Sequence, residues 1–218
     1  MLKAVIFDMD GVIIDSEPLH HYAYHRMFKD VNIKVSDTQY ESFTGQSTIN
    51  ICKKLCDLFQ LEETPEYLVS LKRKHYEYIF ENDKGFDLID GVLDLIKDYH
   101  TNGLTLVLGS SASMPGIERV FKRFDLNKYF IAKLSGANLK ASKPHPEIFI
   151  KAAEVSGFKT SECIVIEDST NGITAANGAG IFSVGFDSLH SKNQDYSKAN
   201  LVIKDFKEIA FSKIVELF

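Results

Sequence analysis

The feature that most restricts the fold is a series of short runs that are apolar almost throughout, separated by stretches with helical periodicity. A strand covered on both faces is typically a continuous apolar run, whereas a half-exposed strand alternates. The alternation of such runs with helices predicts an α/β fold with a doubly wound, parallel sheet. The runs are Leu2–Phe7, Thr105–Gly109, Cys163–Glu167, Ile181–Gly185 and Leu201–Ile203, and the helical stretches are Gly91–Asn102, Pro115–Phe124, Pro146–Ser156, Gly172–Gly178 and Phe206–Leu217.

The interval between the first two runs is much longer than a crossover helix needs. It holds four further helical stretches, and Asp15-Ser16 followed by Pro18 is a typical start of the first of them. We therefore predict a helical domain at residues 16–84, inserted into a core domain formed by residues 1–15 and 85–218. The alternative is a single domain in which these helices pack on the sheet. The four stretches are Pro18–Asp30, Asp37–Phe43, Thr48–Phe59 and Pro65–Phe80.

Composition narrows the possible partners. The 25 Lys and Arg residues are outnumbered by 30 Asp and Glu residues, a net charge of −5, which argues against a nucleic-acid binder. The apolar runs are too short to span a bilayer, and the first ends at Asp8, too early for a secretory signal. The three cysteines then suit a reducing compartment as free thiols. We expect a cytoplasmic monomer without nucleic-acid or membrane partners.

Chemistry-bearing side chains gather at the carboxyl ends of the predicted strands, where open α/β sheets bind their ligands. Carboxylates follow the first and third runs, hydroxyls follow the second, and a lysine lies in a loop before a later helix. We therefore predict a common site at this edge of the sheet. The residues are Asp8, Asp10, Ser110, Ser111, Lys143, Glu167 and Asp168.

Asp8 and Asp10 stand two residues apart, so in an extended segment their carboxylates face the same side. Two like charges that close cannot both ionise cheaply, so the pKa of one should rise. Such a pair divides into a nucleophile and a general acid. Gly11 allows a sharp turn that brings backbone amides near an anion. Taken alone, the pair also fits two carboxylates that only cap a loop.

The charge balance at these strand ends requires a cation. Lys143 offsets only one of the four negative charges carried by Asp8, Asp10, Glu167 and Asp168. A phosphomonoester dianion would be repelled by the remaining negative charge. A divalent cation leaves one excess negative charge, which protonation of Asp10 removes. Carboxylate oxygens without His or Cys at the strand ends favour Mg²⁺ over Zn²⁺.

These residues resemble four motifs of the haloacid dehalogenase-like (HAD) hydrolase superfamily, in the expected order and over essentially the whole chain. The inserted helices resemble the C1 cap of its beta-phosphoglucomutase-like and phosphoglycolate-phosphatase-like branch, on a Rossmann-like core. The matching segments are Asp8-Met9-Asp10-Gly11-Val12 (motif I), Ser110 (motif II), Lys143 within Ser142–Phe149 (motif III), and Glu167-Asp168-Ser169 followed by Asn171-Gly172-Ile173 (motif IV).

The resemblance implies a role for each motif residue. Asp8 would be the nucleophile that forms an aspartyl-phosphate, and Asp10 would protonate the leaving alcohol and then activate water. The Asp8 carboxylate, the Asp10 backbone carbonyl and Asp168 would bind Mg²⁺, with Glu167 nearby. The presence of Asp10 argues against a true dehalogenase. The phosphoryl group would be held by Ser110, Ser111 and Lys143.

The cap of such proteins selects the substrate, and the candidates here are Glu17, His20, Gln46, Thr48 and Lys74. A sugar phosphomutase of this branch typically has an Arg in the cap's specificity loop. Thr48 takes that place here, which favours hydrolysis, whereas His20 matches a His of the mutase pattern. In the alternative interpretation His20 and Lys74 are solvated surface residues.

The sequence thus predicts a Mg²⁺-dependent phosphatase acting on a small phosphorylated metabolite such as a sugar phosphate. Three alternatives stay open: a beta-phosphoglucomutase-type hexose-phosphate mutase, an inorganic pyrophosphatase, and a non-enzymatic phospho-acceptor signalling domain.

Overall fold

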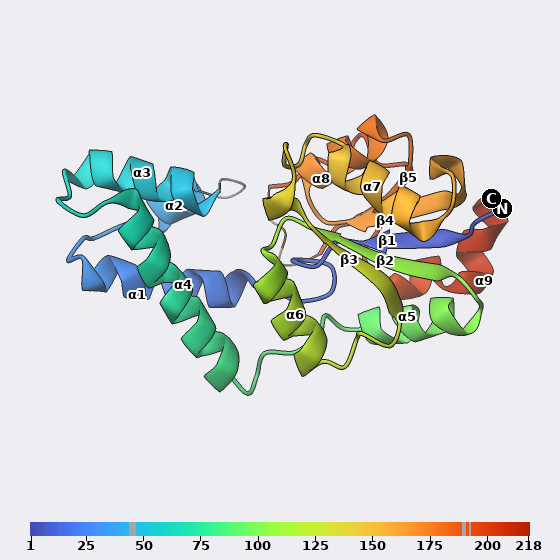
Figure 1. The fold of residues 1–218 in the computed structure, drawn as a ribbon, viewed down its shortest axis with the longest axis horizontal. Helices are drawn as coiled ribbons and strands as arrows, with labels where there is room; N and C mark the ends of the chain where they lie inside the picture. Colours follow the sequence, from blue (N-terminus) through green and yellow to red (C-terminus); the bar gives the residue numbers. More distant parts are fainter. Residues whose placement is uncertain (44–46, 189–190, 192) are drawn as a thin grey trace. The chain divides into compact units, whose positions relative to one another are not determined.

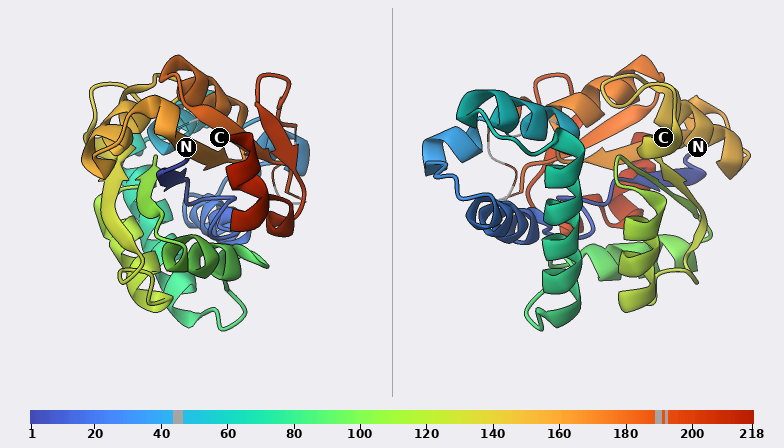
Figure 2. Two further views of the ribbon diagram at one scale, coloured as in Figure 1. Left: turned by 90° about the vertical axis from the view of Figure 1, so that its right-hand side faces the viewer. Right: turned by 60° about the vertical axis from the view of Figure 1, so that its left-hand side comes forward.

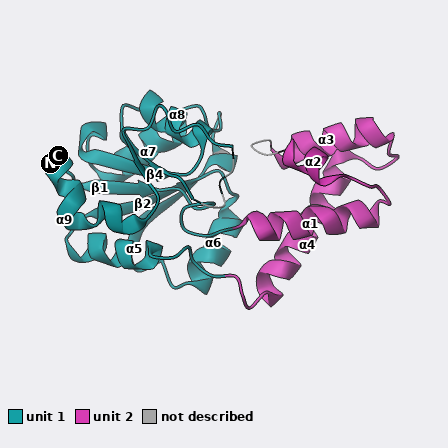
Figure 3. Ribbon diagram, turned by 180° about the vertical axis from the view of Figure 1, so that it is seen from behind, with its two compact units in different colours: residues 1–15, 87–218 teal, residues 16–86 magenta. Residues whose placement is uncertain are grey.

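The computed structural model describes residues 1–43, 47–188, 191 and 193–218, and it divides into two compact units (Figure 3). Unit 1 consists of Met1–Asp15 and Asp87–Phe218, and unit 2 of Ser16–Phe86. The second boundary falls slightly later than the predicted one after residue 84. The reason is that the Phe86 ring packs on Phe80, with ring centroids 5.3 Å apart, so Phe86 belongs to unit 2.

The described part of unit 1 contains one parallel sheet of six strands in the order β3-β2-β1-β4-β5-β6, which confirms the predicted fold class. The chain builds outward from β1 in one direction and then, from β4, in the other. Phe7 of β1 is paired with Ile166 of β4, so the residues that follow these two strands meet at the point where the strand order reverses. The strands are β1 (Ala4–Phe7), β2 (Thr105–Ser110), β3 (Phe130–Ser135), β4 (Cys163–Glu167), β5 (Phe182–Phe186) and β6 (Leu201–Ile203).

Strand β3 was not predicted from the sequence. It lies at the edge of the sheet, and only its first and last residues, Phe130 and Ser135, are buried. Ile131 is 61% exposed, and Lys133 forms an ion pair with Glu118. An edge strand of this composition lacks the continuous apolar run that marks the inner strands.

Helices cover both faces of the sheet (Figure 1). Helices α7 and α8 lie on one face, and α5, α6 and α9 lie on the other. Both views of Figure 2 place the two termini next to each other, at the end of unit 1 where β1 begins. The site at the carboxyl ends of the strands is therefore at the opposite edge. The helices are α5 (Val92–Thr101), α6 (Met114–Arg123), α7 (Glu147–Ser156), α8 (Thr170–Gly178) and α9 (Phe211–Ile214).

The predicted helix at Phe206–Leu217 is broken into a 3-10 turn at Phe206–Ile209, the short helix α9 and a second turn at Val215–Leu217. Ala210 takes an extended backbone with ψ 151°. Two hydrogen bonds from other parts of the chain fix this break. The Tyr99 hydroxyl donates to the Ile209 carbonyl at 2.5 Å, and the Phe211 N–H donates to Asp98 at 2.7 Å.

Unit 2 is helical, with a core of its own. Its helices are α1 (Glu17–Asp30), α2 (Asp37–Glu41), α3 (Thr48–Phe59) and α4 (Pro65–Asn82). The hydroxyls of Ser36, Ser47 and Thr64 accept backbone N–H groups in the first turns of α2, α3 and α4. The core contains Met27, Cys52, Leu55 and Leu68, all fully buried.

No helix within the described residues is both long and apolar enough to span a membrane. Cys52, Cys56 and Cys163 are free thiols.

Candidate functional site

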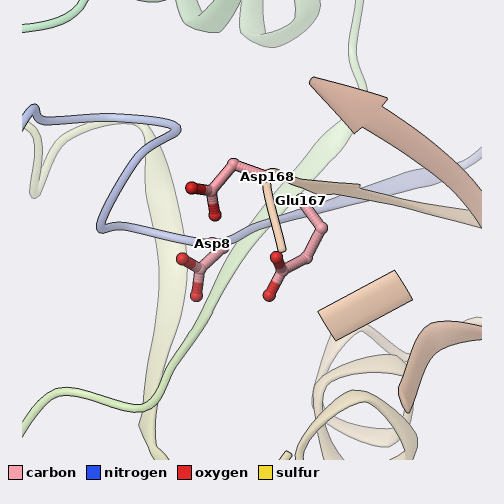
Figure 4. Close-up of side chains that lie close together, drawn as sticks. All are labelled: Asp8, Glu167 and Asp168. Carbon is pink, nitrogen blue, oxygen red and sulfur yellow. The ribbon is translucent and has the colours of Figure 1, made fainter. Parts of the chain in front are cut away.

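The centre of the site is formed where β1 and β4 end. Asp8 follows β1 directly, and its N–H donates to the Ile166 carbonyl at 3.0 Å, which continues the pairing with β4. Glu167 is the last residue of β4, and Asp168 comes next. One carboxylate oxygen from each of Asp8, Glu167 and Asp168 lies within 4.8 Å of the other two (Figure 4). The topology therefore brings Asp8 to the adjacent carboxylates of Glu167 and Asp168, from which the sequence separates it widely.

Lys143 joins two of these carboxylates. Its Nζ atom lies 2.6 Å from Asp8 Oδ1 and 2.6 Å from Glu167 Oε1, and its side chain is only 7% exposed. Burial opposes the charge of this ammonium, but the two carboxylates outweigh burial, so the pKa of Lys143 is raised. The lysine is therefore held in its charged form beside Asp8.

A single lysine does not balance this cluster. Burial raises the pKa of Asp8 well above its usual value; Lys143 opposes the rise, and Glu167, Asp168 and Asp10 add to it. Burial, followed by the charge of Glu167, raises the pKa of Asp168 to about 7. A divalent cation would relieve both effects. Clustered carboxylate oxygens are the ligands that Mg²⁺ prefers, so the residues fit this ion.

Glu167 is held in a closely fitting position. The N–H and the hydroxyl of Ser169 both donate to Glu167 Oε2 at 2.9 Å, and the Ser169 hydroxyl also accepts the N–H of Gly172 at 3.0 Å. A Cβ atom at Gly172 would lie 1.8 Å from the Glu167 carboxyl carbon. The absence of a side chain at Gly172 therefore makes room for the carboxylate.

Asp168 depends on a glycine in the same way. Gly11 has a φ of +82°, which favours glycine, and a Cβ atom there would lie 2.0 Å from Asp168 Oδ2. The turn after Asp8 therefore approaches the second acidic segment closely only because residue 11 has no side chain.

Asp10 lies outside the cluster of three side chains. It is half-buried and pairs with Ile14 in the turn closed by the Gly11 N–H, which donates to the Ile14 carbonyl at 2.8 Å. Its charge nevertheless contributes to the raised pKa values of Asp8 and Asp168. The predicted contribution of the Asp10 backbone carbonyl to Mg²⁺ binding stays a prediction.

The predicted phosphate-binding hydroxyls lie at the end of β2. Ser110 is fully buried, and its Oγ accepts the Ala112 N–H at 3.0 Å, which leaves the Ser110 proton for another acceptor; Ser111 is exposed. The Ser135 hydroxyl, from the unpredicted strand β3, donates to the Ala112 carbonyl at 2.6 Å and fixes this turn. Ser135 could have been recognised from the sequence only if strand β3, which ends at this residue, had been predicted.

The predicted substrate residues of unit 2 have different environments. His20 is half-buried, and its Nδ1 accepts a hydrogen bond from Lys72 Nζ at 2.7 Å. The exposed Glu17 accepts the Tyr40 hydroxyl at 3.1 Å. Thr48, half-buried, is the first residue of α3, whereas Lys74 is exposed. Gln46 lies outside the described residues.

The buried lysine of unit 2 is therefore Lys72, and not Lys74. Lys72 is 7% exposed, and its Nζ lies 5.2 Å from the ring centroid of Tyr24 and 4.9 Å from that of Tyr76. The helical periodicity of α4 already indicated in the sequence that Lys72 is buried. Lys72 is one turn from the buried Leu68, whereas Lys74 falls on another side of α4. Burial, together with the charge of Lys72, lowers the pKa of His20 to about 3.

Comparison with known proteins places this geometry in a family. The sequence profile described as "Haloacid dehalogenase-like hydrolase" matches residues 5–186. A "Phosphorylated carbohydrates phosphatase" of Thermotoga maritima is 29% identical over 196 residues, covering 88% of each chain. A "Beta-phosphoglucomutase" of Bacillus subtilis is 26% identical over 221 residues, covering 99% of this chain and 95% of the relative.

A solved structure gives the same result. The crystal structure of a beta-phosphoglucomutase from Clostridium difficile matches with a TM-score of 0.81 and 29% identity, covering 99% of this chain and 96% of that one. The predicted enzyme class, a phosphoric monoester hydrolase, agrees with the matched profile and with the phosphatase name. The chain thus belongs to the haloacid dehalogenase-like hydrolase family, as its strand-end motifs predicted.

Proposed function

We propose that this protein is a Mg²⁺-dependent phosphatase that hydrolyses small phosphorylated metabolites, sugar phosphates in particular, through an aspartyl-phosphate on Asp8. The observation that carries the proposal is the position of the Asp8 carboxylate, 2.6 Å from Lys143 Nζ and within the carboxylate cluster at the ends of β1 and β4. The relative named for phosphorylated carbohydrates supports the choice of a sugar phosphate.

In the first step an Asp8 oxygen attacks the phosphorus atom while the bond to the ester oxygen breaks. The departing alcohol takes a proton from Asp10. Lys143, between Asp8 and Glu167, and the Ser110 hydroxyl stabilise the negative charge on the phosphoryl oxygens. In phosphoryl transfer this positioning and charge stabilisation is most of what the protein supplies.

In the second step Asp10 takes a proton from a water molecule, whose oxygen attacks the phosphorus of the aspartyl-phosphate. The bond to Asp8 breaks, and inorganic phosphate leaves. Mg²⁺ would be held by Asp8, Asp168 and the Asp10 carbonyl with Glu167 nearby, and when bound it would supply positive charge to the phosphoryl oxygens. Because burial raises the pKa of Asp8, Lys143 and a cation are needed to keep this nucleophile ionised.

The test replaces the nucleophile. Asp8→Asn should abolish phosphate release from a panel of sugar phosphates, while Asp125→Asn, the same chemical change in the exposed turn before β3, should keep wild-type turnover. The panel should be ranked by kcat/KM, because specificity is a ratio of those values. Beryllofluoride should modify Asp8 in the wild-type protein. Wild-type turnover in Asp8→Asn would contradict the assignment.

A hexose-phosphate mutase is the second candidate function. It is favoured by the buried ammonium of Lys72 beside His20, which could bind a second anion, and by the relatives named beta-phosphoglucomutase. Thr48, in place of the Arg typical of mutases, favours hydrolysis. An assay with beta-glucose 1-phosphate that measures glucose 6-phosphate against free phosphate separates the two, and pyrophosphate in the same panel tests the pyrophosphatase alternative.

A further inference from the structure

Three side chains from the chain between β5 and β6 hydrogen-bond to the segment that follows β4. These side chains are Ser191, Gln194 and Tyr196. The Ser191 hydroxyl donates to Asp168 Oδ2 at 2.5 Å, and the Tyr196 hydroxyl donates to the Asp168 backbone carbonyl at 2.6 Å. Asp168 is thus held at both its carboxylate and its main chain.

Tyr196 acts where strands β4 and β5 separate. Their pairing ends at Glu167 and Gly185. The Tyr196 hydroxyl lies next to the two carbonyls just beyond this pair, at 2.6 Å from that of Asp168 and 3.1 Å from that of Phe186. A Cβ atom at Gly185 would lie 2.9 Å from Tyr196 Cδ1, so the ring lies directly against the Gly185 backbone. The phenol therefore fixes the main-chain position from which the Asp168 carboxylate projects.

Gln194 secures the residue that starts α8. Its Oε1 accepts the Thr170 N–H at 2.9 Å and the Thr170 hydroxyl at 3.1 Å, and that hydroxyl accepts the Asp195 N–H at 2.7 Å. This closed set of hydrogen bonds ties the chain after β5 to the first turn of α8.

Ser191 restricts the rotation of the carboxylate itself. Asp168 Oδ2 accepts the Ser191 proton, and the carboxylate also packs against Gly11, where a side chain would collide with it. A carboxylate with one oxygen occupied in this way presents its other oxygen in a defined direction. Partners of this kind behind a metal ligand typically change metal affinity by about 10- to 100-fold when removed.

We propose that Ser191 and Tyr196 are positioning residues that orient the Asp168 carboxylate toward the divalent cation and so set the cation affinity of the site. The proposal rests on the proposed function only for the identity of the cation. It assigns to the chain after β5 a part in the site that none of the four sequence motifs contains.

The experiment measures Mg²⁺ binding directly, by titration calorimetry on the full chain after treatment with a chelator. Ser191→Ala and Tyr196→Phe remove one hydroxyl each and keep the rest of the side chain. Each should raise the dissociation constant for Mg²⁺ by about tenfold. Ser191→Thr, which keeps a hydroxyl, should stay close to the wild type. Tyr129→Phe is the matched control, because Tyr129 precedes β3 at the opposite edge of the sheet and packs on His100.

If the two hydroxyls served only to stabilise the fold, the variants would unfold at lower temperature. For a positioning role, the thermal unfolding midpoints of both variants in chelator should match that of the wild type, and the KM for a substrate at saturating Mg²⁺ should not change. A wild-type dissociation constant in both variants, or an equal loss in Tyr129→Phe, overturns the proposal. If Tyr196→Phe is less stable, Ser191→Ala decides, because the Ser191 hydroxyl contacts the Asp168 carboxylate and not its main chain.

The proposed function can fail separately. If no phosphate ester is hydrolysed while Mg²⁺ binding still depends on Ser191 and Tyr196, the phosphatase assignment falls and the positioning role stands. If the wild-type protein binds no Mg²⁺, the positioning role falls as well.

Discussion

Replacing Gly172 with alanine should displace the Glu167 carboxylate without damaging helix α8. The added Cβ atom would lie 1.8 Å from the Glu167 carboxyl carbon, and ordinary van der Waals contact begins at 3.4 Å. The carboxylate must therefore move by about 1.6 Å, which breaks its 2.6 Å contact with Lys143 Nζ. A misplacement of about 1 Å at reacting groups can cost about 100-fold in rate. We expect kcat to fall by at least about that factor.

The helix itself should tolerate the change, since alanine is favoured over glycine inside a helix by about 1 kcal/mol. The assay compares steady-state phosphate release and unfolding midpoints for the wild type, Gly172→Ala and Gly178→Ala. Gly178 lies in the same helix, and a Cβ atom there would come no closer than 3.3 Å to Pro146, so this control should keep wild-type turnover. Turnover of Gly172→Ala within about threefold of the wild type would refute the steric argument.

Three further predictions concern charge. Chelation should abolish activity, and Mg²⁺ should restore it. Because the pKa of Asp168 is about 7, protons compete with the cation for this carboxylate below that pH. The dissociation constant for Mg²⁺, measured by calorimetry, should therefore be about tenfold higher at pH 6 than at pH 8. A constant that is independent of pH would contradict this. Lys143→Met leaves Asp8 without its cation partner, so turnover should fall by about 100- to 1,000-fold in steady-state assays; a smaller loss would argue against its role. His20 has a pKa of about 3 in the folded protein against 6.5 when unfolded, so the unfolded chain binds more protons at this residue between these values, and the His20 contribution to stability falls by about 2 kcal/mol from pH 8 to pH 5. The raised pKa values of Asp8 and Asp168 act in the opposite direction in both proteins, so denaturant unfolding should show the loss as a change in the stability difference between the wild type and His20→Gln.

The inner strands and their site were predictable because burial on both faces imposes a continuous apolar run on the sequence. Asp8, Glu167 and Asp168 could be placed together because residues after parallel strands meet at one edge of the sheet. Lys143 was located by its resemblance to a motif, since no periodicity marks a loop lysine.

The remaining features depend on contacts between distant parts of the chain. The break at Ala210 reflects hydrogen bonds to Asp98 and from Tyr99, which no local pattern encodes. Neither Ser191 nor Tyr196 lies in a helix or strand, and only the folded chain brings them to Asp168. Lys72 is different, because its spacing from Leu68 along α4 already indicated that both side chains are buried on the same face.

The central place of β1 has a consequence for biosynthesis. Of the six strands of this sheet it is synthesised first, yet it pairs with β2 and β4, which begin at Thr105 and Cys163. A ribosome-bound intermediate that ends before β4 contains Asp8 but lacks Glu167 and Asp168, so the cluster of three carboxylates can assemble only after β4 has been translated. Such non-local pairing also slows folding, which lengthens the time during which the apolar β1 must be shielded from aggregation.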